Sequence, residues 1–419
     1  MKKLLLAVPF LLNATTITSL FEAIKNTPDY KLDNVAIKEM KINKDSIKNM
    51  LYPTLKLNGS YEHFNRYNSI VPITPTQSAK LTKTNDSLPF SKNIYRVGFE
   101  ASMPLFIKEI YDNKKKMNRL LKATKISAKI NLLKKEALVV IYVSKLNYLF
   151  SLKKALLKQQ QSIKTTYEAL NVGVKVGRIP EFKLLRLKDS LNQIEIKIAN
   201  LNTNLDDVKS NIYKLTKIYV TKPIDFDSTF IDKGGFISLK PLNEKLKADK
   251  FSIEAKKDKF YPNILLKIKG NKAFADAYNT NDSIEENFAS AGIYVSWDIF
   301  NKKNSSDIQK AKISMIKNKL QIAKTKKDLT AEIIKINNSL KEINKEIKLT
   351  NESIKLKKEL LKGAKVAFKL NRMSVDEYLQ YENDLTKAYS DLANLKATKN
   401  TLKVNKALIY GKNLERIFK

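Results

Sequence analysis

The sequence contains no cysteine and a single histidine, His63. The absence of cysteine excludes disulfide bonds, thiolate metal sites and a lipid-bearing N-terminal cysteine. One histidine cannot by itself build a multi-histidine metal centre. The sequence also lacks a phosphate-binding glycine loop, a nucleophile elbow and a metal-ligand cluster. We therefore predict that the chain is not an enzyme, with no catalytic, cofactor-binding or metal-binding residues and no cofactor.

Long apolar runs are also missing, because no stretch approaches the ~18 uninterrupted apolar residues of a membrane-spanning helix. The N-terminus instead has two lysines, a short apolar segment at 4–12 and small polar residues at 13–19. This pattern predicts an export signal peptide over residues 1–19, the alternative being a buried N-terminal helix or strand. An exported chain without such a helix enters a membrane only as a β-barrel.

Acidic residues are few relative to basic ones: 78 Lys and Arg stand against 42 Asp and Glu, a formal net charge of +36. The lysines are spread along the chain among Ile, Leu and Asn, without an Arg-rich block or an aromatic RNA-binding motif. This distribution is typical of solvated helix faces and predicts no nucleic-acid partner. The alternative is a basic coiled-coil scaffold or binding protein, exported or cytoplasmic, that uses this charge.

Glycine and proline are absent from two long stretches, between Pro104 and Gly173 and between Gly292 and Gly363. A helix of about 65 residues rises roughly 100 Å at 1.5 Å per residue. Apolar residues recur at helical spacing in the first stretch, so we predict long amphipathic helices that pack as coiled coils. Eight of these residues are Leu120, Leu121, Ile126, Ile130, Leu133, Leu138, Ile141 and Leu149.

Apolar and polar residues alternate in four shorter segments, at 55–62, 95–103, 264–269 and 291–298. A period of two predicts strands with one apolar and one polar face. Strands of about ten residues have the length that a tilted transmembrane strand needs. A soluble sandwich would also contain such strands, but it would not explain the adjoining long helices.

A constant offset of 194 residues relates the two halves of the chain. It carries Gly98 to Gly292, Phe106 to Phe300 and Gly177 to Asn371. This register predicts an internal duplication. Since Gly and Asn both tolerate left-handed backbone, each forms a tight turn between two helices. The predicted segments are a first repeat at 20–216, a linker or equatorial segment at 217–250 and a second repeat at 251–419.

The joint order of these motifs resembles the TolC-like outer-membrane factors, also called the outer membrane efflux protein family. The matching residues are Tyr52-Pro53 and Tyr261-Pro262 before strands, Gly98 with 103–106, Gly292 with 297–300, Val176-Gly177-Arg178 with Phe182 and Leu185, and Leu370-Asn371-Arg372 with Leu379.

The resemblance implies a mixed α and β membrane protein. Three protomers with four strands each would form a trimeric 12-stranded β-barrel in the outer membrane, continued by a long periplasmic α-helical coiled-coil barrel. The homotrimer would be the exit duct of a tripartite efflux or type I secretion system. It would contact outer-membrane lipid and passively conduct substrates received from a periplasmic adaptor protein and an inner-membrane pump or transporter.

The resemblance also implies two groups of site residues. By position, the adaptor contact at the periplasmic tip would be formed by Val176, Gly177, Arg178, Leu370, Asn371 and Arg372. Arg178 departs from the family pattern, because the family has an apolar residue at this position. The family narrows its tip with acidic side chains, and Asp376 and Glu377 stand at about that place. The equally open alternative is that both acids are first-turn residues stabilised by a helix N-terminus.

Overall fold

The computed structural model describes residues 15–229 and 231–419. Residues 1–14 of the predicted signal peptide lie outside the described residues, so the signal peptide stays a prediction. The elements in chain order are α1 (Ile17–Ile24), α2 (Pro28–Asn49), β1 (Thr54–Ser69), α3 (Pro75–Lys83), β2 (Phe90–Phe106), α4 (Lys108–Lys175), α5 (Phe182–Thr216), α6 (Leu239–Lys257), a 3₁₀ turn (Asp258–Phe260), β3 (Asn263–Asp276), β4 (Ser283–Ser296), α7 (Lys302–Lys369), α8 (Val375–Tyr410) and α9 (Leu414–Ile417).

Two compact units divide the chain, and each is built from segments that are far apart in the sequence. The sheet unit contains Lys38–Thr124 and Leu242–Gln321. The helical unit contains the described residues up to Ile37, together with Lys125–Pro241 and Ile322–Lys419. Both units therefore draw on both predicted repeats.

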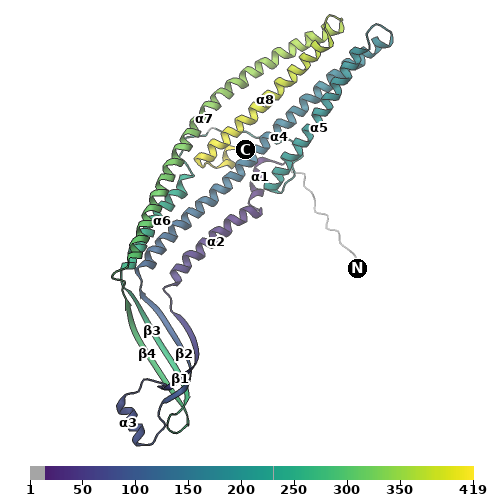
Figure 1. Cartoon of the computed structure of the whole chain (residues 1–419). Coiled ribbons are helices and arrows are strands. Elements are labelled where there is room, and N and C mark those ends of the chain that lie inside the picture. The colour runs from purple at the N-terminus through teal and green to yellow at the C-terminus, as the bar shows by residue number, and fades with distance from the viewer. Residues whose placement is uncertain (1–14, 230) are drawn as a thin grey trace, which may run out of the picture. The chain divides into compact units, whose positions relative to one another are not determined.

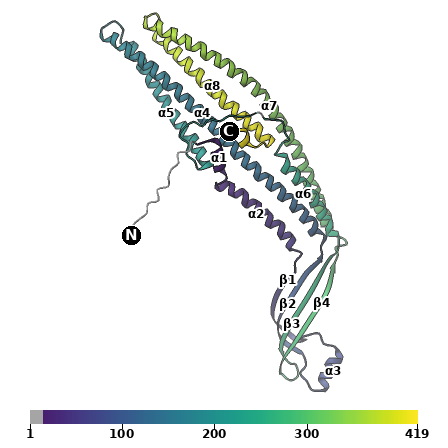
Figure 2. The ribbon, with the colours of Figure 1, turned by 180° about the vertical axis from the view of Figure 1, so that it is seen from behind.

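The sheet unit is centred on four antiparallel strands in the order β1-β2-β3-β4 (Figures 1 and 2). Three of the predicted alternating segments lie within these strands, and the fourth, 291–298, extends two residues past the end of β4, so the strand assignment is confirmed except for those two residues. The two hairpin loops are joined at their tips, where the Ser87 hydroxyl is 2.8 Å from that of Thr280 and the Leu88 amide donates to the Asn279 side chain at 2.8 Å. Helix α3 lies in the longer loop, between β1 and β2.

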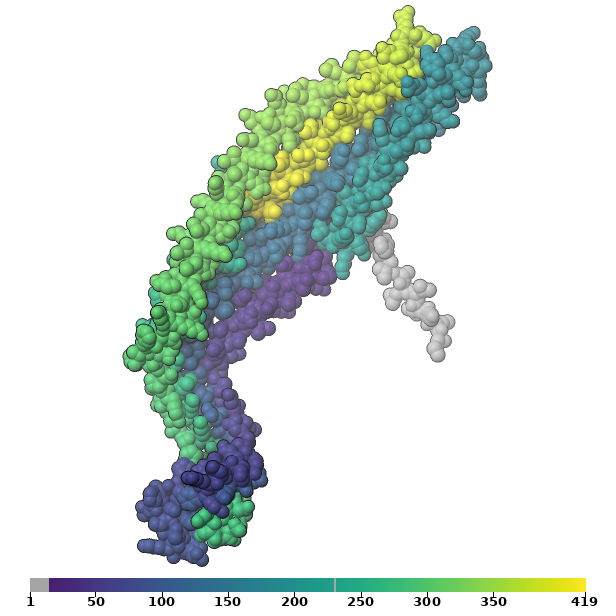
Figure 3. Space-filling view, viewed as in Figure 1, coloured from purple at the N-terminus to yellow at the C-terminus, as the bar shows by residue number. Residues whose placement is uncertain are grey.

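The helical unit contains two helix hairpins, formed by α4 from Lys125 onward with α5 and by α7 from Ile322 onward with α8, and α8 lies between α4 and α7 (Figure 3). Its main hydrophobic core joins α4, α5 and α8, with Val143, Leu205 and Val404 all fully or almost fully buried. Helix α1 packs on the same core through apolar residues spaced three and four apart, because this spacing places them on one helix face. These residues are Ile17, Leu20, Phe21 and Ile24.

Residues 218–229, here called the strap, follow α5 and connect to α4 and to the C-terminus. The Asn147 side chain on α4 donates to the carbonyl of Ile224 at 2.7 Å and accepts from its amide at 3.0 Å. Asp227 and Lys419 exchange two backbone hydrogen bonds, at 2.8 and 3.2 Å. These bonds hold an irregular segment in one position because they satisfy its backbone groups.

The predicted internal duplication is confirmed by the helix boundaries. Helices α4 and α7 each have 68 residues, and both their first and last residues differ by 194 positions. Helices α5 and α8 also end 194 positions apart, at Thr216 and Tyr410. The segment limits at 216/217 and 250/251 stay a prediction, and α6 begins inside the predicted linker. No helix among residues 15–229 and 231–419 combines the length and hydropathy required to cross a bilayer.

Candidate functional site

The strand register places a group of apolar residues from all four strands on one face of the sheet, here called the apolar face. Paired residues of antiparallel strands point to the same side. One transverse row pairs Leu57 with Phe99, Phe99 with Gly270 and Gly270 with Ala289. The neighbouring rows on this face consist of Leu55, Ala101, Ile268 and Ala291, and of Met103, Leu266 and Ile293.

Much of the apolar face is solvent-exposed in the single chain. Leu57 is 83% exposed and Ile293 is 67% exposed. Burying apolar surface contributes roughly 25 cal/mol per Å², so a contiguous face of this kind favours contact with lipid or with another protein. The face therefore lacks its natural environment in the isolated chain.

Aromatic residues mark both ends of the apolar face. Tyr61 and Tyr95 contact each other at one end, with ring centroids 4.8 Å apart. At the other end the Trp297 indole donates to the Phe260 carbonyl at 2.8 Å. Glu285 lies in the same transverse row as Tyr95. Twelve positions separate it from Trp297, which corresponds to about 40 Å along a strand and about 30 Å for a strand tilted by ~40°. This is the thickness of a bilayer's hydrocarbon core.

The opposite face of the sheet, here called the polar face, carries paired charges, and the few apolar residues on it include Ile94 and Ala273, which are buried in a cluster with Ile70. Lys269 lies 3.4 Å from Glu100, and Arg96 forms an ion pair with Glu62. The row pairing Lys56 with Glu100 and Glu100 with Lys269 alternates in sign across three strands. This side of the sheet is therefore suited to water.

The sheet ends at β1 on one side and β4 on the other, and each of these strands pairs with a single neighbour in the described chain. Their outer backbone N–H and C=O groups consequently have no strand partner there. An open edge tends to pair with a further strand, and in lipid each unsatisfied backbone group costs several kcal/mol.

The two predicted turns have the same backbone hydrogen bonds. Gly177 has φ +72° and Asn371 has φ +57°, so both adopt the predicted left-handed conformation. The amides of Gly177 and Arg178 donate to the carbonyls of residues 174 and 173. Those of Asn371 and Arg372 donate to the carbonyls of residues 368 and 367, which are the same positions 194 residues later. Both are Schellman helix ends.

The structure brings the two turns together through Lys183 at the start of α5, whose ammonium group lies 3.4 Å from the side-chain oxygen of Asn371. Both turns expose an apolar residue, since Val176 is 62% and Leu370 59% exposed. The six residues of the predicted adaptor contact therefore form two adjoining exposed turns. Their role as an adaptor contact stays a prediction.

The predicted constriction residues both have partners within the chain. Glu377 forms a capping box with Ser374: its carboxylate accepts from the Ser374 amide and hydroxyl, each at 2.8 Å, and its own amide donates to that hydroxyl at 3.2 Å. Hydrogen bonds from the Ser374 amide and, to a smaller extent, from its hydroxyl stabilise the carboxylate and lower the pKa of Glu377 below its usual value. Asp376 lies 3.7 Å from Arg186 of α5, and both side chains are largely exposed.

A buried polar cluster just beyond these acids was not predicted from the sequence. Glu382 on α8 is 3% exposed, and it accepts hydrogen bonds from Tyr378 at 2.7 Å and from Ser162 of α4. Lys365 of α7 lies 3.6 Å from the same carboxylate. Burial raises the pKa of the Tyr378 phenol, which keeps its proton for donation. The cluster thus connects three helices through one carboxylate.

No family model and no curated protein sequence matches the chain. Solved structures do match its fold. CusC, described in terms of transmembrane channel formation, is 13% identical with a TM-score of 0.77, covering 99% of both chains. The Campylobacter jejuni CmeC outer-membrane channel is 16% identical with a TM-score of 0.74, over 94% of this chain and 84% of that one. The Vibrio cholerae outer-membrane protein VceC is 13% identical with a TM-score of 0.77, over 95% and 96%.

These likenesses confirm the predicted fold class for one protomer, a four-stranded antiparallel sheet joined to long helices as in TolC-like channels. They extend over nearly the whole length of the chain. Because the identities are 13–16%, the likeness is one of fold.

We expect Glu382→Ala to destabilise the helical unit by about 2–4 kcal/mol, because it leaves the Tyr378 hydroxyl and the Lys365 ammonium group without their buried acceptor. Thermal unfolding of the purified chain in detergent measures this. Glu359→Ala is the matched control, since Glu359 is an exposed acid on α7. Equal midpoints for the two variants would show that the cluster contributes no stability.

Proposed function

We propose that the chain is one protomer of a TolC-like outer-membrane channel that serves as an exit duct for substrates delivered from the periplasm. The observation that carries this proposal is the apolar face, which is continuous over four strands, exposed in the single chain and bounded by aromatic residues. The likeness in fold to solved outer-membrane channels supports it.

A homotrimer accounts for the open edges of β1 and β4. Four strands are too few to close a barrel, whereas three copies supply twelve and leave no edge. In this assembly the apolar face contacts lipid and the polar face lines a water-filled lumen. The lumen then carries the charged side chains of the polar face, including Lys269 and Glu100. Conduction through it is passive, and the chain performs no covalent chemistry.

The exposed turns at 176–178 and 370–372 are the proposed contact with a periplasmic adaptor protein. Each combines an exposed apolar side chain with an arginine, and such a combination is frequent at the energetic centre of protein interfaces. The adaptor in turn connects the channel to an inner-membrane pump, as in an efflux or type I secretion system. The long helices extend into the periplasm in this assignment.

The membrane assignment is tested by placing a charge on each face of one strand. Leu57→Lys should destabilise the inserted channel by about 2–4 kcal/mol, because it places an ammonium group on the lipid-facing side near mid-height. Asn58→Lys is the matched control, since Asn58 lies next in the strand and faces the polar side. The measurement is the yield of trimer extracted by detergent from carbonate-washed membranes.

A basic scaffold would be released from membranes by carbonate or high salt, and both lysine variants would then behave alike. Either result would contradict the channel proposal. Electron microscopy of the detergent-extracted wild-type protein provides an independent check, with threefold symmetry as the expected outcome.

The adaptor contact is tested by charge reversal at Arg178 and Arg372. We expect Arg178→Glu with Arg372→Glu to lower the yield of crosslinks to the adaptor severalfold while trimers persist, because both side chains belong to the proposed interface. Arg416→Glu is the control, since Arg416 is an exposed arginine outside both turns. Unchanged crosslinking in the turn variant would remove the turns from the interface.

The constriction proposal is tested by separating the charge of Glu377 from its capping role. Glu377→Gln keeps a side chain that can complete a capping box but removes the charge. If the carboxylate narrows the pore, this change should raise single-channel conductance or alter its cation sensitivity. Ser374→Ala keeps the charge, weakens the cap by about 1 kcal/mol and should leave conductance unchanged. Wild-type conductance in Glu377→Gln would restrict Glu377 to capping.

A further inference from the structure

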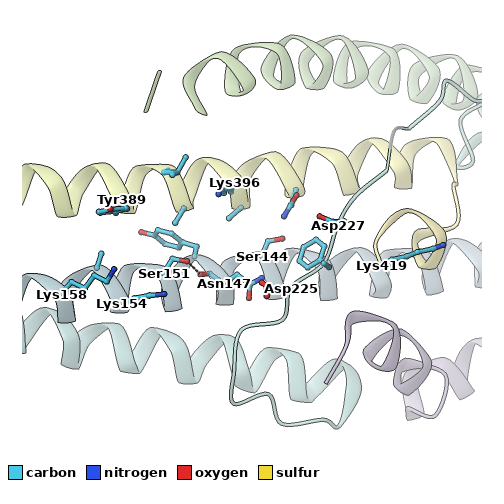
Figure 4. Close-up of a pocket in the computed structure, with 17 residues that line it drawn as sticks. Ser144, Asn147, Ser151, Lys154, Lys158, Asp225, Asp227, Tyr389, Lys396 and Lys419 are labelled. Atoms are coloured by element: carbon cyan, nitrogen blue, oxygen red, sulfur yellow. Dashed lines mark hydrogen bonds between the residues drawn. The ribbon is translucent and has the colours of Figure 1, made fainter. Parts of the chain in front are cut away.

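A large cavity lies within the helical unit, between α4, α8 and the strap (Figure 4). Its volume is about 770 Å³, which falls within the range of small-molecule binding sites. All of its lining residues belong to one protomer and to one compact unit. The cavity is separate from the turns, from the acidic pair and from the sheet.

Four lysines line this cavity, and among the ion pairs of the described residues none involves them. They are Lys154 and Lys158 on α4, Lys396 on α8 and the C-terminal Lys419. Two acids, Asp225 and Asp227 of the strap, also reach the cavity, so its side chains carry an excess of positive charge. Such a site attracts an anion.

The remaining lining combines apolar and aromatic residues with a few neutral polar ones. The apolar and aromatic residues are Tyr148 and Ala155 on α4, Phe226 of the strap, and Tyr389, Leu392, Ala393 and Ala397 on α8. The neutral polar ones are Ser144, Asn147 and Ser151 on α4 and Asn400 on α8. A pocket with an apolar wall and a few charged groups favours a ligand that has an apolar body and a charged end.

Ser144 supplies an independent sign that the cavity is incomplete. This residue of α4 lines the cavity and is 2% exposed, yet its hydroxyl has no hydrogen-bond partner in the part of the chain that the structure describes. Elsewhere on the same helix the Ser151 hydroxyl donates to the carbonyl four residues earlier, at 2.8 Å. A buried hydroxyl without a partner costs roughly 1–3 kcal/mol. A ligand that accepts a hydrogen bond at this position, or a water held by it, removes that cost.

The walls of the cavity are held in place before any ligand binds. Two hydrogen bonds join Asn147 to Ile224, and two more join Asp227 to Lys419, so the strap is fixed on both sides of Phe226. A preformed site binds a ligand without the entropic cost of ordering its walls.

We propose that this cavity binds a small organic anion with a carboxylate or phosphate group and an aromatic or aliphatic body. Lys154, Lys158 and Lys396 are the lysines that would hold the anionic group, since Lys419 lies at the other end of the cavity (Figure 4), and Tyr148, Tyr389 and Leu392 would contact the body. This binding activity goes beyond passive conduction and does not depend on it, because one protomer supplies every residue of the site.

Titration calorimetry of the full-length chain in a non-ionic detergent tests this proposal with three probes: phenyl phosphate, inorganic phosphate and benzylammonium. We expect phenyl phosphate to bind more tightly than inorganic phosphate, and benzylammonium not to bind. Lys154→Gln with Lys396→Gln should weaken phenyl phosphate binding by about tenfold or more, because two charge-assisted contacts are lost. Ser144→Ala should weaken it severalfold.

The control is Lys145→Gln with Lys399→Gln, which removes the same charge from the same two helices at positions outside the cavity lining. Equal affinities for phenyl phosphate in the two double variants would overturn the site, since the attraction would then come from net charge alone. Benzylammonium binding as tightly as phenyl phosphate would also overturn it. Equal binding of inorganic phosphate and phenyl phosphate would exclude the apolar wall from the site.

Discussion

The unpaired backbone edges of β1 and β4 are the constraint on which the rest of the structure depends. Strands β2 and β3 are bonded on both sides, whereas the outer strands are bonded on one side in the described chain. The same four strands expose a continuous apolar face. In water both features favour aggregation, and in lipid the edges alone would cost several kcal/mol for each unsatisfied group. In the proposed channel, lateral closure with further copies would satisfy the edges, and the bilayer would then cover the apolar face. One assembly would thus meet both requirements.

The two duplicated turns have the same backbone conformation but different side chains around them. Gly177 and Asn371 occupy the same left-handed position and end their helices with the same pair of hydrogen bonds. The residues that follow differ, because the offset of 194 relates Lys183 in the first copy to Glu377 in the second. Lys183 reaches the turn of the second copy, whereas Glu377 caps its own helix. The acidic pair is therefore a feature of one hairpin, and each of its members already has a partner within the chain.

The sequence was sufficient to predict the features that depend on local periodicity. The long helices follow from the absence of Gly and Pro, the strands from alternation, and the turns at Gly177 and Asn371 from residue types that tolerate positive φ. Helix α3 was missed because it is short and lies in a loop, although Thr74 and Gln77 form a capping box that signals its start. The Glu382 cluster and the cavity bring together residues of α4 with those of helices more than 200 positions later. Nothing in a single helix pattern reveals such pairings, which arise only from tertiary packing.

The lysines of this chain differ in whether the fold gives them a partner for their charge. Lys269 is paired with Glu100 on the polar face of the sheet, and Lys108 lies 3.4 Å from the ring centroid of Tyr261. In both settings the chain supplies the partner of the charge. The lysines of the cavity have no ion-pair partner among residues 15–229 and 231–419, and they share a concave site in which like charges repel one another. On a solvated helix face these charges would point into open water, whereas here lysines of α4 and α8 line one cavity from opposite sides. Together with the unsatisfied hydroxyl of Ser144, this convergence is better explained by an anionic ligand than by the general basic composition of the chain.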